Sequence, residues 1–555
     1  MLKTTLLTVL FLTAGHSALA QQPLGAGAQV RQIPPAPTAP KAIPEIRIEG
    51  REAPAAATPA GEKILVNALN ITGETRFSEA ELVAAAGFRP GSQLDLADLR
   101  AMASRISAFY NQRGYFVAQA YVPAQDIKDG AVTIAVVEGQ YGEIQLRNQS
   151  RLSDGLARSV LAGLKPGDIV TAAPLQRRLL LLSDIPGVAV TSTLRPGGAV
   201  GTSDLVVDVT PGRFVTGSLE ADNGGNHYTG EWRGGGTVAL NNLTGHGDVA
   251  SLRGLTSGSG LNYIRAAYQA QVQNLTLGAA YEYLRYELGE EFEPLDASGT
   301  AKIASVFASY PVIRSYDNNL YALGTAEAKT FRDEIGATSG VSDKTARVFT
   351  AGVAGDHHDR LWGGGWTVYS AGWSLGDLDI ETPAVRAIDA ATARTNGGYH
   401  KLAFEISRLQ NLPGPVSLYG SLRGQVASKN LDPSEKMELG GLYGVRAYPE
   451  GEAYADQGFI ATIEGRMAAP GWAGRFPGQL QLVGFVDAGS VTINKDPWAP
   501  GDNTRSLSAA GVGLTWADQH NLLVKISYAH RLGDEPAFSA HDRSGRVWVQ
   551  VSKLF

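Results

Sequence analysis

The sequence predicts two small α+β modules of βααββ order, followed by an all-β transmembrane barrel of about 16 antiparallel strands. Three observations predict this architecture. An export signal opens the chain, two successive segments then combine helix and strand periodicity, and the long remainder alternates apolar with polar residues. No run of about 18 apolar residues follows the export signal. Because lipid admits only helices and closed barrels, such an exported chain is either soluble or a barrel.

Residues 1–20 have the pattern of a secretory signal peptide. Lys3 supplies the positive charge, residues 6–14 are mostly apolar, and Ala18-Leu19-Ala20 fits the small-x-small rule for cleavage before Gln21. The alternative is a buried helix. Residues 21–62 are rich in proline and alanine, which cannot hold a core and predict a semi-rigid linker.

The first α+β module is expected over residues 63–141. Ser78 and Glu81 form a capping box, and Asp129-Gly130 marks a hairpin turn. The predicted elements are a strand over 64–71, helices over 79–86 and 96–110, and strands over 116–122 and 131–137.

The second module is expected over residues 142–212, where the same order returns without a shared sequence motif. Ser153 begins one helix, and Pro174 lies near the start of another, where its missing N–H costs little. The predicted elements are a strand near 144–146, helices over 153–164 and from 174 onward, and strands over 188–194 and 205–209.

Residues 213–555 are expected to form the barrel. Helical periodicity ends, and apolar residues occupy every second position, as in the set Leu522, Val524, Ile526 and Tyr528. Apolar-out and polar-in segments of about ten residues are typical of a transmembrane barrel. About 340 residues at roughly 20 per strand and connection predict about 16 strands. The alternative is a soluble sandwich or propeller, whose apolar face would point inward.

Composition excludes several function classes. The chain has 555 residues, no cysteine and a formal net charge of −6, so disulfides, thiolate chemistry and a nucleic-acid face are not expected. The segment 372–376 matches a nucleophile elbow, but it lies in the barrel region with no helix expected after it. Adjacent His357 and His358, expected in a polar turn, make a poor shared metal site. No enzyme activity, cofactor or metal is predicted.

Two charged residues lie in short apolar frames in the last third of the chain. Arg446 follows Gly444-Val445 and precedes Ala447-Tyr448, and Asp487 lies between Phe485 and Gly489. Charges beside apolar neighbours must be hydrated or paired. Pairing would fix the position of the loop that carries Arg446. The alternative places Arg446 in solvent on a surface loop and Asp487 against water.

Several short motifs occur in a fixed order. They are Arg113-Gly114-Tyr115 with Ala120-Tyr121-Val122-Pro123, the glycine turn and strand over 130–139, Asp222-Asn223 with Thr229-Gly230, Asn241-Asn242-Leu243 with Gly247-Asp248, the loop 444–448 and the strand 485–489. Together with the signal peptide, linker, modules and barrel, they resemble the outer-membrane transporters of two-partner secretion, the TpsB-type ShlB/FhaC/HecB-like haemolysin secretion/activation proteins. The βααββ modules resemble POTRA domains (polypeptide-transport-associated).

The resemblance implies roles for several residues. The loop of Gly444, Val445, Arg446 and Ala447 would fold into the lumen and pair with Asp487 in the strand motif of Phe485 and Gly489, with Tyr448 and Glu450 helping to seat it. Ala447 replaces the glycine common in the family. Arg113, Gly114, Tyr115 and Tyr121 would belong to a substrate-binding POTRA surface, with strands 116–122 and 188–194 as docking edges. Phe555 would be the signal read by the barrel-assembly machinery.

A further departure concerns the N-terminal helix that often plugs the barrel in this family. Only Leu24 to Ile33 could be helical here, a stretch interrupted by Gly25 and Gly27, so a full plug is not expected.

The resemblance also implies a function. An unfolded exoprotein, such as a β-helical adhesin or haemolysin-like protein, would bind the periplasmic POTRA domains and cross the barrel in the bacterial outer membrane. No nucleotide-binding loop is present. Outer-membrane lipids and the assembly machinery would be further partners, and nucleic acid would not. A barrel-assembly insertase and a passive porin are the alternatives.

Overall fold

The computed structural model describes residues 25–38, 44–49, 62–469 and 477–555. The predicted signal peptide lies outside these residues. The described chain forms two compact units. One contains residues 25–38 and the barrel, and the other contains residues 44–49, 62–214 and 244–247. No helix within the described ranges is long and apolar enough to cross a membrane.

The first α+β module contains two helices against a small sheet ordered β3-β6-β5. The expected strand 64–71 is split at Asn67, and its first part pairs with an extra strand, β4. The expected strand 116–122 is wrong in length, because Ala118 N–H donates to the carbonyl of Tyr115 and closes a turn there. The elements are β2 (Ile64–Val66), β3 (Ala68–Thr72), α3 (Glu79–Ala86), β4 (Ser92–Leu94), α4 (Leu96–Gln112), β5 (Gln119–Tyr121) and β6 (Ala131–Val137).

The second module packs two helices on a four-stranded sheet ordered β1-β8-β9-β7. Its elements are β7 (Gln140–Asn148), α5 (Asp154–Leu161), α6 (Ala172–Ser183), β8 (Val188–Pro196) and β9 (Thr202–Pro211). The outer strand β1 (Glu45–Ile48) comes from the segment expected to be a linker and pairs in parallel with β8. A four-residue strand carries too little periodicity to be predicted from the sequence.

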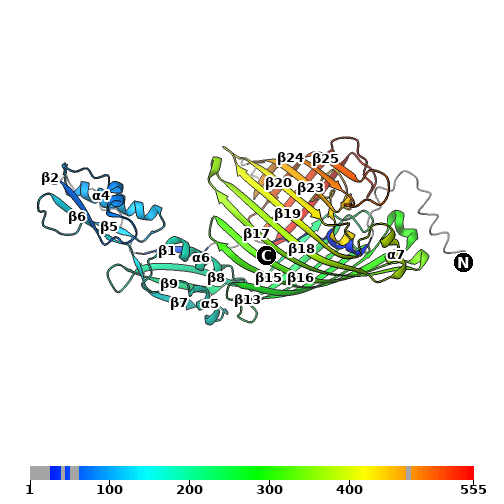
Figure 1. The fold of residues 1–555 in the computed structure, drawn as a ribbon, viewed down its shortest axis with the longest axis horizontal. Helices are drawn as coiled ribbons and strands as arrows, with labels where there is room; N and C mark the ends of the chain where they lie inside the picture. Colours follow the sequence, from blue (N-terminus) through cyan, green and yellow to red (C-terminus); the bar gives the residue numbers. More distant parts are fainter. Residues whose placement is uncertain (1–24, 39–43, 50–61, 470–476) are drawn as a thin grey trace. The chain divides into compact units, whose positions relative to one another are not determined.

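The barrel is closed and has 16 antiparallel strands, which confirms the predicted fold class. The strands are β10 (Val215–Asp222), β11 (Arg233–Asn241), β12 (Val249–Thr256), β13 (Leu261–Val272), β14 (Leu275–Glu287), β15 (Ala297–Arg314), β16 (Asn318–Ile335), β17 (Gly340–Asp359), β18 (Gly365–Ile380), β19 (Gly397–Asn411), β20 (Val416–Ala427), β23 (Gln457–Ala468), β24 (Gln479–Thr492), β25 (Thr504–Ala517), β26 (Leu522–Arg531) and β27 (Gly545–Leu554) (Figure 1). His357 and His358 belong to β17 and not to a turn.

The barrel exposes large apolar side chains on its outer face, as a lipid-facing surface requires. Five such side chains, one from each of β12, β13, β14, β15 and β17, are about half exposed: Leu252, Ile264, Tyr281, Val306 and Phe349. Strand connections alternate between two ends of the barrel. We call the end where β10 begins the near end and the other the far end.

Several short elements lie outside the barrel wall in the same unit. The helix α7 (Pro383–Ala391) connects β18 to β19, so the expectation of no helix after segment 372–376 is wrong; Pro383 is suited to a helix start. Its nine residues are too short a signal to be found by periodicity. The other elements are α2 (Ala26–Arg31), β21 (Met437–Glu438), β22 (Tyr454–Ala455) and the 3-10 turns η1 (Glu290–Leu295), η2 (Gly336–Thr338), η3 (Leu361–Gly363) and η4 (Pro433–Glu435).

Candidate functional site

The connection between β20 and β23, residues 428–456, packs inside the barrel, and we call it the lumen loop. Val445, Ala447 and Tyr448 are buried in one cluster with Phe485 of β24 and Leu507 of β25. Along β24 the neighbouring Val486 is exposed on the outside, so Phe485 and Asp487 point inward. The tip of the loop therefore rests on the inner wall of the barrel.

Arg446 and Asp487 are brought together by this packing. The Arg446 guanidinium donates from Nε to Oδ2 and from Nη2 to Oδ1 of Asp487, each at 2.8 Å. The backbone N–H of Arg446 also donates to Oδ2 at 3.2 Å, and Thr462 donates to Oδ1 at 2.9 Å. Asp487 is 0% exposed. A two-pronged pair of this kind fixes orientation as well as distance.

Three further contacts hold Arg446. Its Nη1 lies 2.9 Å from Oε1 of Glu464 in β23, and its guanidinium lies 3.5 Å from the centre of the Phe485 ring. The indole of Trp548 in β27 donates to its carbonyl oxygen at 2.6 Å. A polar cavity of about 340 Å³ adjoins this group, lined by residues that include Arg446 and Glu464. Arg446 thus links the lumen loop to three strands beside a polar cavity.

The other loop residues singled out by the sequence have packing roles. Tyr448 donates to the carbonyl of Glu535 at 3.0 Å. Gly444 approaches the carbonyl of Gly440 so closely that a Cβ would lie 2.1 Å from it, and a Cβ on Gly489 would lie 2.5 Å from Leu439. Ala447 does not have a positive φ, which explains why alanine is accepted there.

Glu450 lies away from Arg446 and accepts a hydrogen bond from the N–H of Leu442. Its near neighbour Glu452 is almost fully buried, and the sequence did not predict a role for it. Glu452 accepts from the N–H groups of Phe538 and Ser539 at 3.0 and 2.9 Å and pairs with Arg505 at 2.6 Å. It therefore joins the lumen loop to the connection between β26 and β27. A single acidic residue between Gly451 and Ala453 offered no pattern that would have revealed it.

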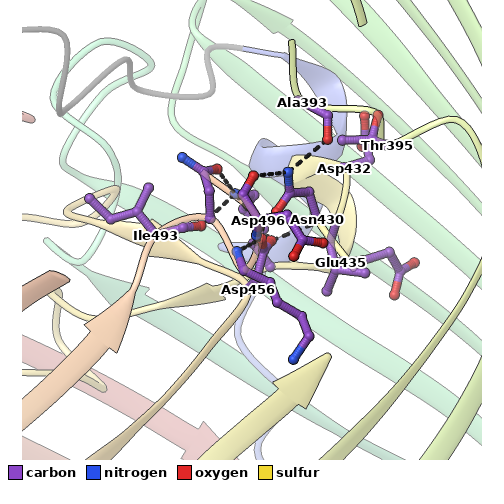
Figure 2. A network of polar contacts seen from close by, with 12 residues as sticks. Ala393, Thr395, Asn430, Asp432, Glu435, Asp456, Ile493 and Asp496 are labelled. Carbon is purple, nitrogen blue, oxygen red and sulfur yellow. Dashed lines mark hydrogen bonds and ion pairs between the residues drawn. The ribbon is translucent and has the colours of Figure 1, made fainter. Parts of the chain in front are cut away.

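The base of the lumen loop is held by a polar network at the far end of the barrel. Figure 2 shows Asn430 between Ala393 and Asp496. Its amide donates to both of their carbonyl oxygens at 2.8 Å, and its Oδ1 accepts from the N–H of Asp496 at 2.8 Å. Asp456 accepts from the N–H of Leu431 and pairs with Lys436 at 3.1 Å. The loop is thus anchored at its base as well as at its tip.

A second element lies in the lumen: the helix α2 and residues 32–34 after it, drawn in dark blue among the barrel strands in Figure 1. Ala26 N–H donates to Asp333 of β16 at 2.7 Å. Arg233 donates to the carbonyl of Gln32 at 2.9 Å, and Arg253 donates to the carbonyl of Pro34 at 2.7 Å. Two lumen arginines therefore hold the backbone that follows the helix.

The glycines of this segment do not interrupt the helix. Gly25 precedes it as the N-cap, and Gly27 lies against η4 of the lumen loop, where a Cβ would come within 2.7 Å of the Ser434 Cβ. From the sequence alone, Gly25 and Gly27 are expected to interrupt a helix, because the contact between Gly27 and Ser434 joins segments far apart in the chain. The helix has only six residues, which agrees with the expectation that a long plug is absent from this stretch.

Two of the four predicted POTRA surface residues, Arg113 and Tyr115, belong to an aromatic cluster. The Arg113 guanidinium lies 3.5 Å from the centre of the Phe109 ring, and Tyr115 packs edge-on against Tyr110 at 5.7 Å. Gly114 has a φ of 90°, which ends α4. Tyr121, on the outer strand β5, is 49% exposed, and Arg113 is exposed as well, whereas Gly114 and Tyr115 are partly buried.

The two expected docking edges differ. In the first module β5 is the outer strand, so one of its edges is free of other described strands. In the second module the expected edge along β8 is wrong, because β1 already covers it from Glu45 to Ile48. Phe555, the predicted assembly signal, exchanges backbone hydrogen bonds with Gly217 of β10 at 3.0 and 3.1 Å.

A closed 16-stranded barrel with a loop packed in its lumen, joined to two βααββ modules, defines a protein-transporting barrel of the outer membrane. The family described as haemolysin secretion/activation protein ShlB/FhaC/HecB matches residues 201–516, and the ShlB-type POTRA domain matches residues 64–139. The chain belongs to this family. It is an outer-membrane transporter of two-partner secretion, with its POTRA domains in the periplasm. The near end of the barrel is therefore periplasmic and the far end extracellular.

Similar proteins agree with this assignment. The heme/hemopexin transporter protein HuxB of Haemophilus influenzae (strain 86-028NP) is 28% identical over 474 residues, 84% of this chain and 82% of its own. The outer membrane transporter CdiB of Dickeya dadantii (strain 3937) is 26% identical over 442 residues, covering 77% and 75%.

Solved structures show the same fold. CdiB from Escherichia coli superposes with a TM-score of 0.66 at 18% identity, covering 91% of this chain and 93% of that one. BamA from Haemophilus ducreyi lacking POTRA domains 1–3 gives a TM-score of 0.56 at 14% identity, covering 89% and 100%.

Proposed function

We propose that this transporter exports one large exoprotein, which binds unfolded to the POTRA domains and passes through the lumen when the lumen loop and α2 move. The observation that carries this proposal is the way the lumen is filled. Arg446 with Asp487 and Ala26 with Asp333 hold the two elements by side-chain hydrogen bonds, and neither element is a strand of the wall. Both can leave without breaking the barrel.

The first contact with the cargo is proposed at the POTRA strand edges. An extended chain can add to β5 through backbone hydrogen bonds, which read little sequence, with Tyr121 as an exposed apolar contact. At β8 the cargo would have to replace β1, whose N-terminal carbonyl at Glu45 accepts from Ser192 at 3.3 Å. The strand β1 would then act as a guard that a cargo strand displaces.

The class of cargo follows from the same chemistry. A β-helical adhesin or haemolysin-like protein can fold at the extracellular surface one turn at a time, and that folding would supply the driving force in a chain with no nucleotide-binding loop. The named relatives are a heme/hemopexin transporter and an outer membrane transporter, which supports a dedicated cargo for this chain as well. No catalytic role is proposed.

The test is quantitative proteomics of the culture medium and the outer membrane with and without the gene. Loss of one large protein from the surface and medium, with other barrels unchanged, is expected. A broad fall in many outer-membrane barrels would contradict the proposal and support an assembly insertase. Unchanged export together with lost uptake of small solutes would support a porin.

A further inference from the structure

The extracellular end of the barrel brings together two histidines and a glutamate from three connections that are far apart in the sequence. His227 follows β10, Glu291 lies in η1 after β14, and His541 lies between β26 and β27. One ligand atom from each lies within 4.8 Å of the others. The sequence predicts no metal site, because these residues share no local spacing.

The spacing of the cluster is close to that of ligands around a zinc ion. Nε2 of His227 lies 3.2 Å from Oε2 of Glu291, and Nδ1 of His541 lies 3.8 Å from Oε1 of the same carboxylate. Zinc bonds of about 2.0–2.1 Å in a tetrahedron place ligand atoms about 3.3 Å apart. Small side-chain rotations would therefore bring all three onto one ion and leave a fourth position for water.

The surroundings orient the ligands. Oε1 of Glu231 lies 4.0 Å from Nδ1 of His227, on the side of the ring away from Glu291. At this distance the two groups are not hydrogen-bonded, but a shift of about 1 Å would let the carboxylate accept the N–H of a metal-bound imidazole. Arg546 donates to the carbonyl of His541 at 3.1 Å, and Gly289 N–H donates to the carbonyl of Tyr228 at 2.8 Å. The three connections are thus positioned before any ion binds.

Charge and access also suit a dication. Glu291 and Glu231 bring two negative charges to the cluster, which a divalent ion would counter together with the Arg546 guanidinium near Glu231. The His227 side chain is 11% exposed, whereas that of His541 is 65% exposed, so one ligand is fixed and the site is open to solvent.

The cluster lies above the closing pair of strands, β10 and β27, which we call the seam. Seam pairing runs from Ser218 with Leu554 to Asp222 with Gln550, and backbone hydrogen bonds extend it to Gly217 with Phe555 and from Asn223 N–H to the carbonyl of Val549. Beyond it the side chain of Asn223 continues the contact, donating to the carbonyl of Val547 at 2.8 Å and accepting from Val549 N–H at 2.7 Å. His227 and His541 are on the connections that leave these two strands.

We propose that His227, Glu291 and His541 bind a divalent transition-metal ion, with zinc as the best fit, and that the ion clamps the extracellular end of the seam. Imidazole with carboxylate suits zinc, and also copper and nickel, whereas calcium and magnesium prefer all-oxygen sites. Such an ion would be bound by His227 after β10 and by His541 before β27. One of these ligands would have to leave the ion before β10 and β27 could separate at the extracellular end.

Zinc binding to the full chain tests the site. The protein, purified in detergent without a histidine tag and stripped with EDTA, is titrated with zinc chloride in competition with a chromophoric chelator. One zinc per chain is expected. Because loss of an outer-shell partner alone costs about tenfold or more, His227→Gln, His541→Gln and Glu291→Gln should each weaken binding by at least about tenfold. His520→Gln is the matched control, since His520 also faces a carboxylate, Asp518, at 3.5 Å and belongs to no cluster of three within the described residues.

Equal zinc affinity in all four variants and the unaltered protein would overturn the site. Hydrogen–deuterium exchange then tests the clamp independently of secretion. Zinc should slow exchange in residues 223–232 and 532–544 of the unaltered protein and leave His541→Gln unchanged. Zinc bound at one per chain with no change in either segment would overturn the clamp. Folding of each variant is checked by the heat-dependent gel mobility of the closed barrel.

Discussion

Trp548 donates its indole N–H to the backbone carbonyl of Arg446 at 2.6 Å, across 102 positions of the sequence. This bond joins the tip of the lumen loop to the last strand of the barrel. The same arginine pairs with Asp487 of β24. Movement of the loop therefore requires that contacts to two separated parts of the wall break together, and each can be removed on its own.

Trp548→Phe should loosen the tip of the loop while keeping its packing. The change leaves a partly buried carbonyl without its donor, which costs about 1 kcal/mol. We expect faster hydrogen exchange in residues 440–450 and more frequent channel opening in planar bilayers. Trp366→Phe, at an exposed position of β18, is the control and should behave like the unaltered protein. Identical exchange in both variants would show that the indole does not restrain the loop.

Asp487→Asn should have a larger effect on the same loop. The substitution removes the charge that pairs with the mostly buried Arg446 guanidinium and leaves Glu464 as its remaining carboxylate partner. We expect this loss to cost about 3 kcal/mol. That corresponds to about a hundredfold rise in the population with the loop released. Single-channel conductance and export of the cargo measure it. Arg332→Gln, which breaks a half-exposed pair with Glu334, serves as the comparison and should cost less than about 1 kcal/mol. Closed-channel behaviour and normal export in Asp487→Asn would rule out a latch.

Gly27→Leu should displace α2 from the lumen. A side chain at this position meets Ser434 at 2.7 Å, and overpacking of this kind costs about 1–3 kcal/mol. The short helix has little stability of its own to offset it. Larger and more frequent conductance events are expected. Gly324→Leu, where a side chain meets nothing within 4 Å, is the matched control. If both variants conduct alike, α2 does not obstruct the pore.

Ile46→Asp should release β1 from β8. Ile46 packs against the core of the second module, whereas Ile48 on the same strand is 36% exposed. A carboxylate at position 46 loses its water on docking, so pairing should weaken. Faster hydrogen exchange over β8 is expected, together with faster cross-linking of an unfolded cargo segment to this edge. Ile48→Asp should leave both unchanged. Faster exchange without faster cross-linking would mean that β1 does not guard a cargo site.

Glu138 should make the first module sensitive to acid. Burial tends to raise the pKa of its carboxyl, but hydrogen bonds from Thr75, Tyr110 and Arg76 outweigh this and lower the pKa below the ordinary value of 4.5. The folded state then binds fewer protons than the unfolded state. Its contribution to stability is therefore complete above about pH 4.5 and is lost as the pH falls through the lowered pKa.

Hydrogen exchange of the first module in the full chain, followed from pH 6 downward and corrected for intrinsic rates, measures this loss of stability. Glu138→Gln should be less stable at neutral pH and should lack this part of the acid dependence, because a neutral amide does not titrate. Glu143→Gln, where the side chain lies at the surface of β7, provides the comparison. An acid profile that is the same in Glu138→Gln and in the unaltered protein would contradict the assignment.

The sequence by itself determined the features that depend on local pattern. Alternation of apolar and polar residues marks each wall strand, since a strand in lipid must expose one face to hydrocarbon and the other to the lumen. Capping residues such as Ser78 and Glu81 marked the start of α3. The frames around Arg446 and Asp487 signalled two charges that needed partners, because unpaired buried charge is costly.

Only the tertiary structure decided which distant segments meet. The helix α2 and the strand β1 have six and four residues, too few to form alone, and they exist here because Asp333, Arg233 and β8 satisfy their backbone groups. Glu452, Trp548 and the His227–Glu291–His541 cluster likewise gain their roles from neighbours far away in the sequence. Local periodicity shows which face of a helix or strand is buried. It does not show which distant segment of the chain packs against that face.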